Sequence, residues 1–347
     1  MNIRENIPIA DLTTMRLGGA ARYVIDIKTE DEVAEAYAFA AQKQLPVYVL
    51  GYGSNIIGRD KGFNGVVLVN QIKGMGAQTP ERTGNVELFS YSGEILDDFV
   101  TYGTKLGYSG MEAMSAIPGT VGAAPVQNVG AYGQDIAQSL VSVTAYDTKT
   151  AKFVELPKDQ LDLGYRHSIF NSGSEIGRYF ITKITVKLHR GQLEPPFYTS
   201  LQAYVDEHKI TDYSPDSIRK CVRAVREGKL PDPLSIASSG SFFKNVYLNA
   251  EEAKAAEAKG IPVWDGGKIP SGWLIENAGL KGKEFFGMRV SDKAALVLIN
   301  ESAKTYADLA KARQAIIDAV YAKFGYRLEQ EPMELGDESW KNWMVAN

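Results

Sequence analysis

The residues best suited to chemistry lie in a glycine-rich segment, Ile117–Gly133, which carries four glycines, two prolines and no charged side chain. The segment is too irregular for a helix and too rich in glycine for a strand, and glycine lets a backbone approach a ligand closely. Backbone N–H groups in such loops bind phosphate groups without any lysine. The segment therefore indicates a loop shaped around a phosphorylated ligand, and a buried connection without a ligand is the alternative.

A second segment of this kind lies upstream. The apolar run Pro46–Leu50 predicts a buried strand, and Gly51–Asn55 (GYGSN) follows it directly. A strand, a glycine turn and then small hydroxyl and amide groups form a common phosphate-binding layout. It is not the dinucleotide fingerprint, because Ile56 stands in place of the third glycine. Alone it is also typical of a plain turn, but two such loops predict a long ligand that contains a pyrophosphate.

Eight short segments form one pattern over nearly the whole chain. They are Thr13–Gly19, Leu50–Asn55, Ile117–Gly133, Gly164–Phe170, Lys229–Pro233, Gly240–Asn245, Gly272–Glu276 and Leu328–Glu331. In this order they resemble the UDP-N-acetylenolpyruvoylglucosamine reductase family. The resemblance implies an enzyme with non-covalently bound FAD that uses NADPH to reduce UDP-N-acetylglucosamine enolpyruvate to UDP-N-acetylmuramate in peptidoglycan precursor synthesis.

The resemblance also implies three catalytic residues. Hydride from NADPH would reach flavin N5 and then C3 of the enolpyruvyl group, which leaves negative charge at C2. Ser241 would give the proton to C2, Glu331 would donate a hydrogen bond or proton to the substrate carboxylate, and Arg166 would pair with that carboxylate. A guanidinium matches a carboxylate at two points, which a lysine cannot do. Glu329 is the alternative acid, because LEQEP departs from the family's usual Leu-Glu-Pro-Glu-Val.

Ligand contacts follow from the same resemblance. Those implied for FAD are Gly51, Tyr52, Gly53, Ser54, Asn55, Ile56, Pro118, Gly119, Thr120, Gly122, Ala123, Gln127, Asn128, Gly130, Ala131, Gly133 and Ile181. Those implied for the substrate are Tyr132, Tyr198, Arg226, Lys229 and Asn245. Tyr198 lies where one family subtype places a mobile loop whose tyrosine covers the substrate phosphates. Arg226 and Lys229 end a predicted helix, where the helix dipole alone also favours a cation.

Composition argues against several classes of protein. A length of 347 residues predicts two or three domains, and a net charge of −4 argues against nucleic-acid binding. One cysteine, Cys221, and three scattered histidines argue against a disulfide and a metal site. The chain shows no signal-peptide core and no apolar run of membrane-spanning length. We expect a cytoplasmic monomer that acts on small molecules and contacts no membrane.

The elements that must position these residues follow from hydrophobic spacing. Predicted strands are Arg22–Lys28, Pro46–Leu50, Gly65–Asn70, Val86–Tyr91, Val141–Asp147, Lys152–Leu156, Phe180–Leu188 and Ala295–Asn300. Predicted helices are Thr29–Gln44, Glu94–Leu106, one that Ser214 caps and Gly228 ends, one from Asn249 to Gly260, and Thr305–Phe324, with Gly325 as its stop. Alternation of apolar and polar residues in Phe180–Leu188 predicts a half-exposed strand.

These elements predict an α+β protein. The resemblance implies a two-part FAD-binding domain of the vanillyl-alcohol-oxidase/PCMH type, followed by a C-terminal α+β substrate-binding domain. We expect the first flavin subdomain over residues 1–72, the second over 73–213 with the tail 327–347 joined to it, and the substrate domain over 214–326.

Two other functions compete with the reductase. One is a FAD-dependent oxidase on the same fold, which would use oxygen and make peroxide; Gly240–Asn245 (GSFFKN) and the Tyr198 segment argue against it. The other is a catalytically silent nucleotide-binding protein. The joint presence of Arg166, Ser241 and Glu331 argues against a silent protein, since it would need none of the three.

Overall fold

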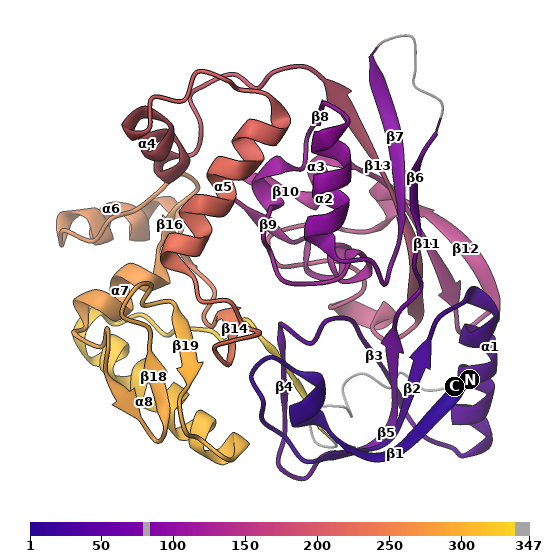
Figure 1. The fold of residues 1–347 in the computed structure, drawn as a ribbon. Helices are drawn as coiled ribbons and strands as arrows, with labels where there is room; N and C mark the ends of the chain where they lie inside the picture. The colour runs from indigo at the N-terminus through magenta and orange to yellow at the C-terminus, as the bar shows by residue number, and fades with distance from the viewer. Residues whose placement is uncertain (79–83, 337–347) are drawn as a thin grey trace.

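The computed structural model describes residues 1–78 and 84–336, and its first part is a mixed sheet covered by one helix (Figure 1). The strand order is β1 (Asn2–Pro8), β2 (Ala20–Ile27), β5 (Phe63–Asn70) and β3 (Val47–Leu50). β1 is antiparallel to β2, whereas β2, β5 and β3 run parallel. Helix α1 (Glu30–Gln42) buries Val33, Ala36 and Ala40, and the Thr29 hydroxyl accepts a hydrogen bond from the Glu32 N–H group as its N-cap.

The second part is an antiparallel sheet with helix α2 (Leu96–Lys105) against it. Its described strands are β12 (Lys152–Pro157), β11 (Leu140–Asp147), β13 (Tyr179–Arg190), β7 (Asn85–Tyr91) and β6 (Met75–Ala77), in that order, with β8 (Tyr108–Ser109) paired to β13. Short elements near the glycine-rich segment are β9 (Gly130–Ala131), β10 (Gln134–Asp135) and α3 (Ile136–Ser139). Further 3-10 turns span Ile9–Leu12, Glu112–Met114, Val121–Ala123, Pro125–Gln127, Lys158–Gln160 and Gly173–Glu175.

Strand β13 differs from its prediction as a half-exposed strand. Thr182 and Thr185 are buried, as are the apolar residues between which they lie. The reason is that β13 is central in its sheet and both of its faces are covered. Phe180 packs into the core of the first part, whereas Ile184 packs into the core that contains α2.

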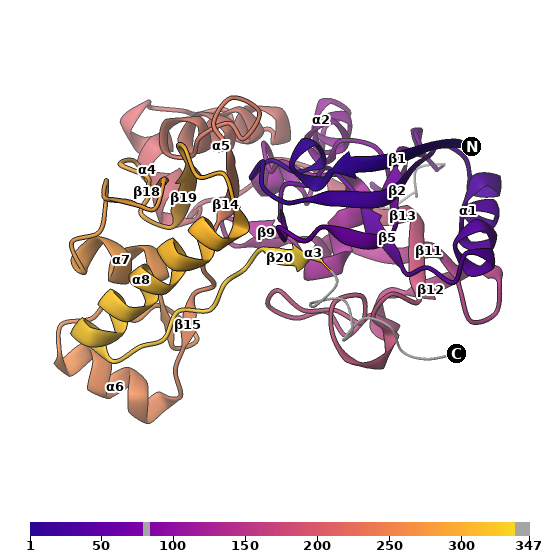
Figure 2. The ribbon, with the colours of Figure 1, turned by 90° about the horizontal axis from the view of Figure 1, so that it is seen from below.

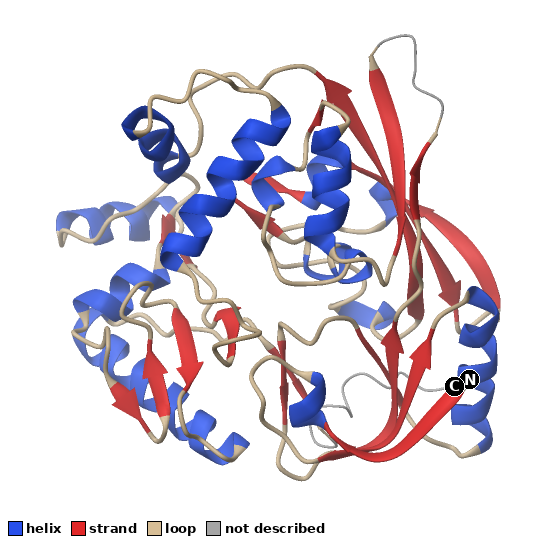
Figure 3. Cartoon of the chain, viewed as in Figure 1, coloured by secondary structure: helices blue, strands red, loops and turns tan. Residues whose placement is uncertain are grey.

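Helices α4 (Thr199–Glu207) and α5 (Pro215–Lys229) follow, and α5 lies side by side with α2 (Figure 3). The predicted apolar face of α5 is confirmed, because Ile218, Cys221 and Val222 pack on Leu201 and Val205 of α4. Two details of the prediction are wrong. The Ser214 hydroxyl bonds the Asp212 carboxylate instead of capping the helix, and the helix continues through Gly228 to Lys229.

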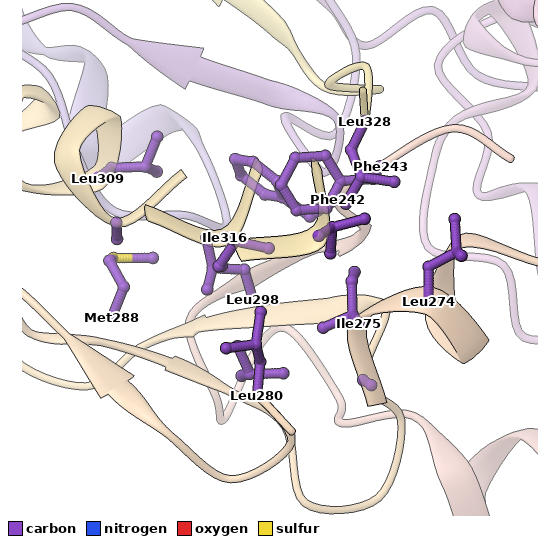
Figure 4. Packing of buried hydrophobic residues seen from close by; sticks show 14 of the residues in the cluster. Phe242, Phe243, Leu274, Ile275, Leu280, Met288, Leu298, Leu309, Ile316 and Leu328 are labelled. Carbon is purple, nitrogen blue, oxygen red and sulfur yellow. The ribbon is translucent and has the colours of Figure 1, made fainter. Parts of the chain in front are cut away.

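The third part is a small sheet packed on helices. Its described strands run in the order β14 (Ser238–Ser241), β19 (Val297–Asn300), β18 (Met288–Val290) and β17 (Glu284–Phe285), and its helices are α6 (Ala250–Ala258), α7 (Ser271–Asn277) and α8 (Tyr306–Phe324). A hairpin pairs β15 (Val246–Tyr247) with β16 (Lys268–Ile269). The core centres on Phe242 and Phe243, whose rings lie 5.1 Å apart, with Leu328 beside them (Figure 4).

The predicted helix ends in this part are confirmed. Asn249 and Glu252 form a capping box at the start of α6, and Thr305 forms another with Asp308 at the start of α8. Gly325 takes φ +79° directly after α8, a left-handed conformation that favours glycine.

The tail after α8 crosses from the third part to the first (Figure 2). Met333–Leu335 (β20) pairs in parallel with Ile56–Gly58 (β4). The prediction that the tail rejoins the second part is therefore wrong for this strand, because the backbone of β4 offers it a partner and Leu335 is buried in the core of the first part. Residues 337–347 of the predicted tail lie outside the described residues. No helix in the described ranges is both long and apolar enough to cross a membrane.

Candidate active site

A deep pocket lies between the first and second parts. Its volume is about 1140 Å³ when the open mouth is included. Twelve of the residues predicted to bind FAD line it: Gly51, Tyr52, Gly53, Ser54, Asn55, Ile56, Gly119, Thr120, Gly122, Ala123, Gln127 and Ile181. The two segments that the sequence singled out thus form one pocket.

Direct hydrogen bonds join the two loops. The Ser54 hydroxyl donates to the Pro118 carbonyl oxygen at 2.6 Å, and the Asn55 amide donates to Gln127 Oε1 at 2.8 Å. Gly51 lies so close to Thr120 that a Cβ atom there would stand 2.4 Å from the threonine hydroxyl oxygen. Glycine at position 51 is therefore a packing requirement as well as a feature of the pocket wall.

Five residues predicted to bind FAD lie outside the pocket lining, and the structure gives them other roles. Pro118 holds the loops together through its carbonyl group. The Asn128 side chain is buried and bonds the backbone at Gly164 and Ala137. Gly130 and Ala131 form β9, which pairs with β10, and Gly133 lies in the turn that follows.

Several pocket residues were not predicted. Tyr37, Tyr48, Asn70, Phe170, Tyr179 and Met333 are among them. Burial raises the pKa of both the Tyr37 and the Tyr48 hydroxyl, so these groups stay protonated in the pocket wall. Tyr48 and Asn70 lie in strands that were predicted, so alternation along those strands could have indicated them. Met333 reaches the pocket from the tail, for which the local sequence carries no signal.

The donor groups of the pocket fit FAD. None of the residues that line it, within the described ranges, carries a charged side chain. Its wall offers glycine backbone, the hydroxyls of Ser54 and Thr120 and the amides of Asn55 and Gln127. Neutral donors of this kind suit a pyrophosphate, and the apolar strand β3 with Tyr48 suits a flat aromatic ring.

The three predicted catalytic residues come together from different parts of the chain. Arg166 Nε donates to Glu331 Oε1 at 2.6 Å, and the Glu331 side chain is only 8% exposed. The Glu331 N–H group donates to the carbonyl oxygen of Phe242, the residue next to Ser241 on β14. A loop of the second part, a strand of the third part and the tail thus meet at one place.

The electrostatic balance at Glu331 has opposing causes. Burial raises the pKa of this carboxyl above its usual range, while Arg166 and, more weakly, Lys244 act to lower it. The alternative acid, Glu329, has a side chain that is 72% exposed and pairs with Lys244 Nζ at 2.5 Å. Of the two carboxyl groups, only Glu331 is both buried and paired with Arg166, so the geometry favours Glu331.

The predicted substrate residues gather in two places. In the first, Tyr132 and Tyr198 meet edge to face with ring centroids 5.7 Å apart, and burial raises the pKa of the Tyr132 hydroxyl while the charge of the nearby Arg226 acts to lower it. Burial lowers the pKa of Arg226, and its Nε atom has no partner among the described residues. Lys229 is exposed at the end of the same helix, α5.

The second place is at Asn245, in the third part. Its side-chain oxygen accepts a hydrogen bond from the Ser271 N–H group at 3.1 Å, and its own N–H group donates to the Tyr165 hydroxyl at 3.3 Å. The Tyr165 ring in turn lies 5.1 Å from the Arg166 guanidinium. Asn245 is therefore linked to the catalytic loop. The described residues contain no cluster of His, Cys, Asp and Glu that could hold a metal ion.

Two glycine substitutions in the pocket wall should have different effects. A Cβ atom at Gly122 would lie 2.4 Å from Ser92 Cβ, so Gly122→Ala must displace the loop and should lower the melting temperature of the flavin-free protein. Gly119→Ala is the matched control, since its Cβ atom would meet only Ser54 Oγ, at 4.0 Å. It should leave that melting temperature unchanged while lowering the flavin content. Thermal denaturation and the visible flavin absorbance distinguish the two, and equal melting temperatures for both variants would contradict the packing argument.

Comparison with known proteins agrees with this geometry. A family model described as "UDP-N-acetylenolpyruvoylglucosamine reductase, C-terminal domain" matches residues 232–335, and one described as "FAD binding domain" matches residues 21–156. The chain is 35% identical to a UDP-N-acetylenolpyruvoylglucosamine reductase of Ralstonia nicotianae, over 94% of this chain and 97% of that protein. A reductase of the same name from Neisseria gonorrhoeae is 35% identical over 95% of this chain and 96% of the relative.

A solved structure shares the fold. It is UDP-N-acetylenolpyruvylglucosamine reductase (MurB) from Thermus caldophilus, with a TM-score of 0.65 and 22% identity, and the alignment covers 96% of this chain and all of that one. The predicted α+β class with a FAD-binding domain is confirmed. The sequence identity to curated relatives, which extends over almost the full length of both chains, shows that this chain belongs to the UDP-N-acetylenolpyruvoylglucosamine reductase family.

Proposed function

We infer that this chain reduces UDP-N-acetylglucosamine enolpyruvate to UDP-N-acetylmuramate, with FAD as cofactor and NADPH as hydride donor, as a step of peptidoglycan precursor synthesis. One observation at the site supports this assignment. Glu331, buried against Arg166, lies two residues before Met333, which lines the pocket that fits FAD. The same short tail thus connects the flavin pocket to a carboxyl group and a guanidinium suited to a carboxylate substrate.

Each catalytic residue has a proposed task. The two loops at Gly51–Asn55 and Gly119–Gln127 would hold FAD, which would supply hydride transfer between NADPH and the enolpyruvyl group. Arg166 would hold the substrate carboxylate by two-point hydrogen bonding. Glu331, protonated, would donate to that carboxylate as negative charge spreads into it, which lowers the barrier because the donor is already in place. Ser241 would give the proton to C2, with Phe242 and Phe243, both buried, limiting the access of water.

The remaining contacts concern the UDP-sugar. We propose that Arg226 and Lys229 bind the diphosphate, because a half-buried guanidinium whose Nε atom has no partner among the described residues and an exposed ammonium group lie within one turn of α5. Tyr132 and Tyr198 would cover the phosphates, and Asn245 would bind the sugar or nucleotide. These roles are supported by position and charge.

The domain roles are also proposals. Residues 1–72 and 73–213 would hold the flavin, and residues 214–326 would bind the substrate. We place α5 with the second part, since it packs on α2 and α4. We further propose a monomer that has no nucleic-acid partner, in agreement with the net charge of −4, and that works in the cytoplasm, where NADPH is supplied.

The direct test is NADPH consumption by the purified flavoprotein under anaerobic conditions, with and without UDP-N-acetylglucosamine enolpyruvate. We expect many turnovers only when the substrate is present. A single stoichiometric oxidation of NADPH that the substrate cannot extend would reject this acceptor. Peroxide formation in air with an alcohol or lactone, without NADPH, would support the oxidase instead.

Replacement of Ser241 should separate the two half-reactions. In Ser241→Ala, NADPH should still reduce the flavin at the wild-type rate, whereas reoxidation by the substrate should slow by about 10²- to 10⁴-fold, the usual contribution of a positioned proton donor. Stopped-flow absorbance measures both steps. Ser239→Ala is the control, because the buried Ser239 hydroxyl has no hydrogen-bond partner among the described residues. Near-normal reoxidation in Ser241→Ala would exclude Ser241 as the donor.

The pH dependence should identify the acid. Because only the protonated carboxyl donates, the rate of substrate-dependent reoxidation should fall as the pH rises through the raised pKa of Glu331. The rate of flavin reduction by NADPH should not show this decrease. The decrease should be absent in Glu331→Gln and present in Glu329→Gln. Stopped-flow measurements across pH 5 to 9, roughly the span of shifted carboxyl pKa values, provide the test. Absence of the decrease in Glu329→Gln alone would assign the acid to Glu329.

A further inference from the structure

We propose that Gln330 is a positioning residue that holds the Glu331 carboxyl in its working direction by fastening the tail to Arg313 of α8. The inference rests on the proposed function, because it assumes that Glu331 is the acid. It concerns a residue that would not touch the substrate and acts only through its neighbour.

The Gln330 side chain uses both ends of its amide. Its Oε1 atom accepts a hydrogen bond from Arg313 Nη1 at 2.6 Å. Its Nε2 atom donates to the Pro332 carbonyl oxygen at 2.7 Å and lies 3.3 Å from Glu334 Oε1. Gln330 and Pro332 flank Glu331 in the chain. The hydrogen bond between them therefore spans the backbone of Glu331 and restrains it on both sides.

The opposite edge of the same segment is paired with the third part. The Glu331 N–H group donates to the Phe242 carbonyl oxygen at 2.9 Å, and the Lys244 N–H group donates to the Glu329 carbonyl oxygen at 2.8 Å. Gln330 faces Phe243 in a bridge between these two bonds. In an extended segment, neighbouring side chains point to opposite sides. Glu331 accordingly meets Arg166 of the second part, whereas Gln330 meets Arg313 of α8.

Arg313 is a firm attachment point. The same Nη1 atom donates to Glu334 Oε1 at 2.7 Å, and the Tyr306 hydroxyl donates to that oxygen at 2.7 Å. Glu334 also pairs with Arg59, which follows β4 in the first part. The side chains of Arg313 and Glu334 are 23% and 13% exposed, so water competes little for these bonds.

Helix α8 itself is docked on the first part. The N–H groups of Tyr306 and Ala307, at its N-terminus, donate to the two carboxylate oxygens of Asp60 at 2.6 and 3.1 Å. A negative charge at this end also complements the helix dipole. The orientation of Arg313 is therefore set by the first part, which contributes a wall of the flavin pocket. Through Gln330, the first part therefore also determines where Glu331 lies.

The test compares Gln330→Met, which keeps the length of the side chain and removes its three hydrogen bonds, with Gln314→Met. Gln314 is an exposed glutamine on α8 that bonds only Asp318 among the described residues, so it is a matched control. In Gln330→Met we expect kcat for the substrate-dependent step to fall about 10- to 100-fold, since a displacement of about 1 Å can cost about 100-fold. KM and the rate of flavin reduction by NADPH should stay near wild type.

A rescue variant separates positioning from general stability. Gln330→Glu keeps the acceptor for Arg313 but loses the donor to Pro332, so it should recover only part of the lost kcat. If Gln330→Glu is no faster than Gln330→Met, or if both half-reactions of Gln330→Met slow equally, the inference is overturned. A lower melting temperature with unchanged kcat would overturn it as well.

Two further controls keep the result decisive. If Gln330→Met does not retain flavin, Gln330→Asn replaces it, because its shorter amide cannot reach Arg313 but stays polar, and the same kinetic outcome is expected. A wild-type protein that shows no substrate-dependent turnover would mean that the proposed function has failed. An active wild type beside a fully active Gln330→Met would mean that only the positioning role has failed.

Discussion

A buried carboxyl group paired with a guanidinium, Glu331 with Arg166, is the constraint on which much of this structure depends. Buried polar and charged groups are costly unless their partners are held in good geometry. Here the acid comes from the tail and the guanidinium from a loop of the second part, so neither residue's own element can hold the pair together. The backbone bonds to residues 242–244, the parallel pairing of β20 with β4 and the cluster around Glu334 all fasten the tail where that pair forms.

The flavin pocket meets a different requirement, because it must accept a pyrophosphate without fixed positive charge. Its wall is made by two irregular loops, and hydrogen bonds between their own side chains and backbone give those loops their shape. Glycine at positions 51 and 122 lets the loops approach Thr120 and Ser92 more closely than any side chain would permit. Because these neutral donors are already held in place, they can bind an anion with little rearrangement of the loops. Such a site suits a cofactor that stays bound.

Local chemistry in the sequence predicted local structure well. The helix starts at Asn249 and Thr305 and the stop at Gly325 depend only on residues within one turn, and the structure confirms them. Both phosphate-type loops also reach the pocket. Features set by distant segments could not be predicted in this way. The burial of Thr182 depends on packing between two parts, and Met333 reaches the pocket through a strand pairing that no local pattern encodes. Asn128, a residue of the same glycine-rich loop, has a second role that the sequence did not indicate, since its side chain bonds the backbone at Gly164 and Ala137.

The pairing of β20 with β4 has a consequence for the order in which the molecule can be completed. Strand β4 leaves the ribosome early, yet the partner it has in the described structure is encoded near the far end of the chain. Contacts between segments so far apart in the chain tend to form late in folding. During synthesis the pocket therefore lacks Met333 until the tail has emerged and paired with β4. The rest of the described lining comes from residues 37–181, which are synthesised much earlier.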